Sequence, residues 1–157
     1  MLRNKKGFTL LEILLVVAAI AILAGIVIVA INPNKQLGET RNAQRRSDVN
    51  SILNAVYQYT IDNNGTLPSG LDSTYTSAQV LGTDGSGCDS TCTTTTTVAA
   101  CVDLTSNLVS DYIVGIPTDP STGTAANTEY YIERLSSGRV TVGSCDTEQS
   151  ATIVITR

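Results

Sequence analysis

The chain has 157 residues, with 10 basic and 14 acidic side chains and a net charge of −4. This balance argues against a broadly basic surface for nucleic acid. The chain has no histidine, which excludes a His-based catalytic triad and a His-containing zinc site. Hydrophobic residues make up 42% of the chain, a share that excludes wholesale disorder.

The first predicted element is a long apolar segment that follows a short basic one. Three basic residues lie within residues 1–7, and residues 8–31 are almost entirely apolar. As a helix, residues 8–31 would be about 36 Å long, which is enough to cross the ~30 Å hydrocarbon core of a bilayer. The basic residues predict that the N-terminus is cytoplasmic and that the chain after residue 31 lies outside the cytoplasm.

Glu12 is the charged exception within this apolar segment. It lies either close enough to the membrane interface to stay hydrated or beside a cationic partner, because an unpaired carboxylate is costly in hydrocarbon. An ordinary secretory signal, cleaved after Ala30, is the competing interpretation. Its apolar region would usually be only 7–15 residues long, and Glu12 argues against it.

The segment Lys5-Lys6-Gly7-Phe8-Thr9-Leu10-Leu11-Glu12 resembles the class III signal of type IV pilins and type II secretion pseudopilins. The resemblance implies cleavage between Gly7 and Phe8 by a prepilin peptidase, followed by N-methylation of Phe8. It also implies an assembly salt bridge between Glu12 and the Phe8 amine of a neighbouring subunit. Residues 1–7 would then be a leader peptide. Its removal takes away three of the 10 basic residues and leaves 7 basic and 14 acidic, or −7.

Residues 32–64 predict the amphipathic half of a helical spine. Pro33 predicts a break from the first helix, since proline lacks a backbone donor. Apolar residues then recur at helical spacing, and Asn63-Asn64-Gly65 predicts the end of the helix. The expected polar face comprises Glu39, Arg41, Arg45, Arg46 and Asp48. We expect a solvated face there; a phosphate-binding patch and pairing between subunits are the alternatives.

Residues 65–157 predict a globular head. Half of residues 72–97 are Ser or Thr, which predicts a long surface loop with one short strand at 79–81. A short helix is expected within 104–113, and strands at 129–135, 139–143 and 151–156. The predicted fold is α+β: a long N-terminal helix with a membrane half and an amphipathic half, packed on a small antiparallel sheet and stapled by disulfides.

All the cysteines lie on the expected extracytoplasmic side, which predicts two disulfides among Cys88, Cys92, Cys101 and Cys145. Zinc is disfavoured, because the spacing is not that of paired C-x-x-C motifs and histidine is absent. Three pairings are possible. We expect Cys101–Cys145 with Cys88–Cys92. The first would tie the short helix to the end of the sheet, as the resemblance implies for the C-terminal loops of pilins, and the second would close a small hairpin in the Thr-rich loop.

No catalytic constellation is expected, and neither a cofactor nor a metal is predicted. Some relatives in the pseudopilin family bind calcium through loop carboxylates. Asp84, Asp89 and Asp119 are possible oxygen donors here, but no loop has the carboxylate density of a calcium motif.

The resemblance therefore implies a structural subunit of a type IV pilus-like filament, not an enzyme. The expected partners are copies of the chain itself, the prepilin peptidase, a membrane assembly platform and, before assembly, the lipid bilayer. The expected location is the cell membrane in a single pass before assembly and the cell surface afterwards. The alternatives are a minor pilin, a pseudopilin of a type II secretion or competence system, and a membrane-anchored extracellular binding module.

Overall fold

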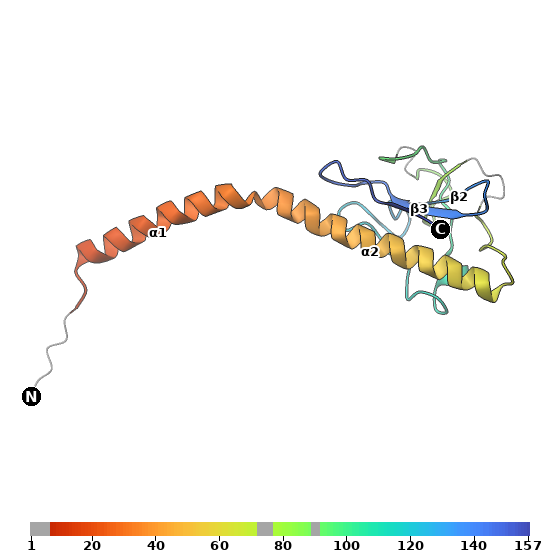
Figure 1. Ribbon diagram of the computed structural model, residues 1–157, viewed down its shortest axis with the longest axis horizontal. Coiled ribbons are helices and arrows are strands. Elements are labelled where there is room, and N and C mark those ends of the chain that lie inside the picture. The colour runs from red at the N-terminus through yellow and green to blue at the C-terminus, as the bar shows by residue number, and fades with distance from the viewer. Residues whose placement is uncertain (1–6, 72–76, 89–91) are drawn as a thin grey trace, which may run out of the picture. The chain divides into compact units, whose positions relative to one another are not determined.

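The computed structural model describes residues 7–71, 77–88 and 92–157 (Figure 1). The basic residues of the expected leader and Asp89 lie outside the described residues. The chain divides into two compact units, residues 1–37 and 38–157, which are described separately. The elements in order are α1 (Leu10–Ile31), α2 (Pro33–Asp62), β1 (Gln79–Val80), α3 (Thr105–Leu108), β2 (Tyr130–Arg134), β3 (Val140–Ser144) and β4 (Val154–Thr156).

The two long helices are separated by a single residue, Asn32, which adopts the left-handed conformation at φ 45°. Pro33 is the first residue of α2, where its missing N–H costs no helical hydrogen bond. The Asn32 side-chain oxygen accepts a hydrogen bond from the Lys35 amide at 3.4 Å. One residue thus ends α1 and caps α2, at the position where the sequence predicts the break.

Helix α2 ends as the Asn-Asn-Gly signal predicts. The Gly65 amide donates to the Thr60 carbonyl at 2.8 Å, and Gly65 has a φ of +86°. This six-to-one hydrogen bond, with the preceding Asn64 in the left-handed conformation at φ 53°, closes a Schellman-type cap. The cap satisfies a carbonyl that the helix would otherwise leave unpaired.

The sheet has four antiparallel strands in the order β1-β2-β3-β4. Strands β2 and β3 pair over five residues, from Tyr130↔Ser144 to Arg134↔Val140. The Leu135 amide donates to the Arg139 carbonyl at 2.8 Å, and Gly138 has a φ of +82°, so the Ser136-Ser137-Gly138 turn forms the predicted hairpin. The predicted fold, a long helix packed on a small antiparallel sheet with two disulfides, is confirmed.

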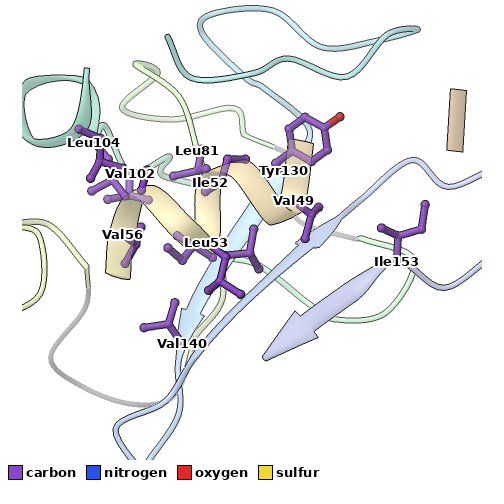
Figure 2. Packing of buried hydrophobic residues seen from close by; sticks show 14 residues of the cluster. Val49, Ile52, Leu53, Val56, Leu81, Val102, Leu104, Tyr130, Val140 and Ile153 are labelled. Carbon is purple, nitrogen blue, oxygen red and sulfur yellow. The ribbon is translucent and has the colours of Figure 1, made fainter. Parts of the chain in front are cut away.

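The alternation of side chains along β2 gives the sheet two buried faces. Tyr130 and Ile132 point to the face covered by α2, where the main hydrophobic core lies (Figure 2). Tyr131 points to the opposite face, into a second cluster. The main core consists of Val49, Ile52, Leu53, Ala55, Val56, Leu81, Val102, Leu104, Leu108, Tyr130, Ile132, Val140, Val142 and Ile153.

The disulfides join Cys88 to Cys101 and Cys92 to Cys145, so the expected pairing is wrong. The reason is the course of the Ser/Thr-rich segment, which returns along the sheet instead of leaving it. The Val98 amide donates to the Ala78 carbonyl, and the Val102 amide donates to the Val80 carbonyl. This parallel return covers the β1 edge and brings each cysteine beside a distant partner.

Two other expectations need correction. The Ser/Thr-rich segment is not simply a surface loop, because its Cys88, Cys92 and Thr97 are buried. The threonine run is anchored as well: the Thr93 hydroxyl donates to the Cys145 carbonyl, and the Thr94 and Tyr131 hydroxyls lie 2.7 Å apart. The predicted helix within 104–113 is only α3, four residues long, and its C-cap residue Val109 is extended.

Candidate functional site

The first candidate site is the N-terminal end of α1, where the sequence places its signal. Gly7 and Phe8 precede the helix, and the Phe8 side chain is 80% exposed. Thr9 is the N-cap: its hydroxyl accepts a hydrogen bond from the Glu12 amide at 3.2 Å, and its own amide donates to the Glu12 carboxylate at 3.4 Å. This reciprocal pair is a capping box.

The capping box gives Glu12 a local role that the sequence analysis missed. The sequence does contain the capping-box pattern, Thr-x-x-Glu before an apolar run, from which this role could be predicted. The carboxylate also lies in the first turn, at the positive end of the helix dipole. The backbone amides of Thr9 and Glu12 are therefore both hydrogen-bonded within the chain. The negative charge of Glu12 has no basic partner among the described residues.

The rest of α1 exposes its apolar side chains. None of its 22 residues is buried, and large apolar side chains are exposed along its whole length. Helix α1 is long and apolar enough to cross a membrane. A helix that is hydrophobic all round is normally buried in lipid or among other helices, so α1 needs one of these environments.

The second notable cluster lies in the head, around a buried arginine. Arg45 extends from α2, and its guanidinium makes two hydrogen bonds to the Asp119 carboxylate, at 2.5 and 3.0 Å. Both side chains are almost fully buried. Glu148 accepts a third hydrogen bond from Arg45 at 2.9 Å and also binds Arg41. The cluster thus ties two loops, around residues 119 and 148, to one helix.

The predicted solvated face is therefore wrong for part of α2. Arg45 and Asp48 are buried, because each finds a partner on the sheet side. The Tyr130 hydroxyl donates to Asp48 at 2.8 Å. Arg46 is exposed, as expected for the polar face. No local pattern points to these partners, since they lie 74 to 103 residues away from Arg45 and Asp48 along the chain.

Charge pairing shifts the acidic pKa values in this cluster downward. The hydrogen bonds from Arg41 and then Arg45 lower the pKa of Glu148 to about 2. Burial by itself raises the pKa of Asp119, but the hydrogen bonds from Arg45 and Ser121 outweigh it and lower the pKa overall. Burial and the hydrogen bond to Asp48 raise the pKa of Tyr130, which keeps this phenol neutral. All three groups therefore hold one protonation state over the neutral range.

The cluster fits a structural role better than a metal site. Both Asp119 oxygens are taken up by the Arg45 guanidinium, and Ser121 donates to one of them. Among the described residues, no group of three or more carboxylates, cysteines or histidines could hold a metal ion. Asp84 and Asp119 belong to no such group, and Asp89 lies outside the described residues.

Comparison with known proteins points to the N-terminal site. Residues 2–28 match the prokaryotic N-terminal methylation motif. The chain is also 38% identical over 72 residues to the type II secretion system core protein G of Aeromonas hydrophila. This match covers 45% of the chain and 49% of that relative, so the chain spans about half the length of the curated relative. No solved structure matches.

Proposed function

We propose that this chain belongs to the type IV pilin and type II secretion pseudopilin family and is the structural subunit of a helical filament that assembles through α1. We infer that its role is structural and not enzymatic; the match to the N-terminal methylation motif and the identity to core protein G support this. One observation carries the proposal: α1 exposes its apolar side chains over its whole length, and Glu12 is its only charged residue. In a filament, α1 would pack among copies of itself.

We propose that processing creates the partner of Glu12. Hydrolysis of the Gly7–Phe8 peptide bond by the prepilin peptidase leaves a carboxylate on Gly7 and an ammonium group on Phe8. N-methylation replaces one proton of that amine with a methyl group from a methyl donor, and the product keeps its positive charge at neutral pH. A carboxylate near the centre of an apolar bundle costs about 2.5–3.5 kcal/mol unless it is paired. The Phe8 amine of a neighbouring subunit would offset that cost and fix the axial register.

The proposed location follows from this sequence of steps. Residues 1–7 act as a cytoplasmic leader and residues 8–31 cross the membrane once before assembly. An assembly platform in the membrane then extracts α1 into the filament, and residues 32–64 continue the spine. The head, residues 65–157, lies on the filament surface, outside the cytoplasm.

A pseudopilin role is the second candidate, and the identity to core protein G favours it. A major pilin would be abundant in long sheared surface fibres. A pseudopilin or minor pilin would be scarce there, and its deletion would stop secretion or uptake without removing long fibres. The third candidate, an anchored binding module, needs only that α1 insert in the membrane.

Mass spectrometry of the N-terminal peptide from sheared surface material tests the proposal. A chain that begins at N-methylated Phe8 supports filament processing. A chain that begins at Ile31 would mean ordinary secretion, and an intact N-terminus in the membrane would leave a simple anchor.

Two substitutions separate the charge of Glu12 from its capping role. Glu12→Gln keeps a side chain that can complete the capping box but removes the charge, whereas Glu12→Ala removes both. We expect both variants to insert in the membrane at least as well as wild type and both to fail in assembly. Normal fibres from Glu12→Gln would contradict the proposed pairing.

A further inference from the structure

The observation that carries the inference is an unusual charge arrangement on α2. Arg46 and Asp62 are both exposed, and they lie 16 residues apart on the same helix. Asp62 is in the last turn of α2, where no basic residue lies. A carboxylate there meets the negative end of the helix dipole, which is unfavourable for an isolated helix.

The surroundings of Asp62 add to this negative charge. Asp62 accepts a hydrogen bond from the Tyr112 hydroxyl, and Asp111 lies close enough for both carboxylates to raise the pKa of Tyr112, although burial is the larger cause. Asp111 is exposed. No ion pair is found for Asp62 or Asp111 within the described residues.

Arg46 carries the opposite charge, 16 residues before Asp62 on α2. The neighbouring Arg41 and Arg45 are neutralised inside the head by Asp119 and Glu148. Arg46 has no ion pair within the described parts of the chain. Between Arg46 and Asp62 the only acidic or basic residue is Asp48, which is buried against Tyr130. At 3.6 residues per turn, positions 16 residues apart lie about 160° apart around a helix, so Arg46 and Asp62 are on opposite flanks of α2. They are about 24 Å apart along its axis, at 1.5 Å per residue.

We propose that the two flanks of α2 dock on neighbouring copies of the chain, with Asp62 of one subunit beside Arg46 of the next. The inference rests on the proposed function and deepens it by naming an interface in the head. Copies in a filament repeat by a head-to-tail contact, so their α2 helices share one polarity. A stagger of about 24 Å between two such helices brings opposite charges together. Such pairing selects the register between subunits and weakens as salt is added.

Charge reversal in cells that process and assemble the full-length chain tests the proposal. We expect Arg46→Glu and Asp62→Arg each to cause a several-fold loss of sheared filament. The double variant Arg46→Glu/Asp62→Arg should restore most of the loss, because the pair is re-formed with its charges exchanged. Single variants that assemble at the wild-type level, or a double variant no better than the singles, would overturn the inference.

Matched controls separate assembly from folding. Arg139→Glu and Asp84→Arg make the same charge changes at exposed residues outside α2, and we expect wild-type filament levels from both. The melting temperature of the detergent-solubilised Asp62→Arg chain should equal or exceed that of wild type, since a cation suits a helix C-terminus. A folding defect would lower it, and a filament loss accompanied by that defect would count against the interface.

The outcome also separates the two levels of the proposal. If wild type begins at N-methylated Phe8 and forms filaments while the charge variants also assemble normally, the interface is overturned and the filament function stands. If wild type neither matures at Phe8 nor forms filaments, both proposals fall.

Discussion

Arg45 and Asp119 form a buried, doubly hydrogen-bonded ion pair, although they are 74 residues apart in the sequence. Arg45 comes from α2 and Asp119 from the loop that precedes β2, so the pair joins the helical spine to the head. Removing Arg45 leaves the Asp119 carboxylate buried without a cation, and removing Asp119 leaves Arg45 with only the partly exposed Glu148 as its counter-charge.

Substitution of one partner should therefore be strongly destabilising. We expect Arg45→Met or Asp119→Asn to lower the free energy of unfolding by about 3–5 kcal/mol, the usual cost of breaking a buried pair. Chemical denaturation of the detergent-solubilised chain measures it. The control is Arg46→Met on the exposed side, which should stay within about 0.5 kcal/mol of wild type. Equal effects at positions 45 and 46 would contradict the buried pair.

Acid should weaken the same cluster through Glu148. The pKa of Glu148 is about 2 in the folded chain and 4.5 ordinarily, so the unfolded chain binds the proton more readily. The stabilisation is therefore complete above about pH 4.5 and is lost as the pH falls towards 2. Glu148→Gln should flatten the decline of stability with acid in that window. Ser150→Ala, an exposed change in the same loop, should keep the wild-type profile.

The two disulfides should contribute unequally. On the chain-entropy model, closing the 53-residue separation of Cys92–Cys145 is worth about 4 kcal/mol, and closing the 13-residue separation of Cys88–Cys101 about 3 kcal/mol. The double variant Cys92→Ala/Cys145→Ala should thus lose more stability than Cys88→Ala/Cys101→Ala. Peptide mapping of the non-reduced chain checks the pairing itself, and a Cys101–Cys145 peptide would refute it.

Gly143 should not tolerate a side chain. It pairs with Tyr131 across β2 and β3, and an added Cβ would overlap the Tyr131 ring. We expect Gly143→Ala to cost about 1–3 kcal/mol through overpacking. Gly85→Ala, where a Cβ meets nothing within 4 Å, is the matched control and should be nearly neutral. In thermal melts, the cost of Gly143→Ala should shrink in a Tyr131→Ala background, because neighbouring sites couple.

The elements that depend on local pattern could be predicted from the amino-acid sequence. The apolar run from Phe8 to Ile31, the break at Pro33 and the end of α2 before Gly65 each follow from hydrophobicity or backbone restriction over a few residues. The Ser136-Ser137-Gly138 hairpin is local in the same sense. The acidic residue of the N-terminal site, Glu12, was also visible because it interrupts an apolar segment.

Contacts between residues far apart in the sequence became known from the three-dimensional fold. The Arg45–Asp119 pair, the burial of Asp48 and the pairing of Cys92 with Cys145 join residues 53 to 82 positions apart. The sequence does not show whether the partner of a charged side chain or a cysteine is water or a residue far along the chain. These partners are set by tertiary packing, in which the Ser/Thr-rich segment runs back along β1 and the loops around residues 119 and 148 contact α2. Spacing along the sequence does not determine this packing.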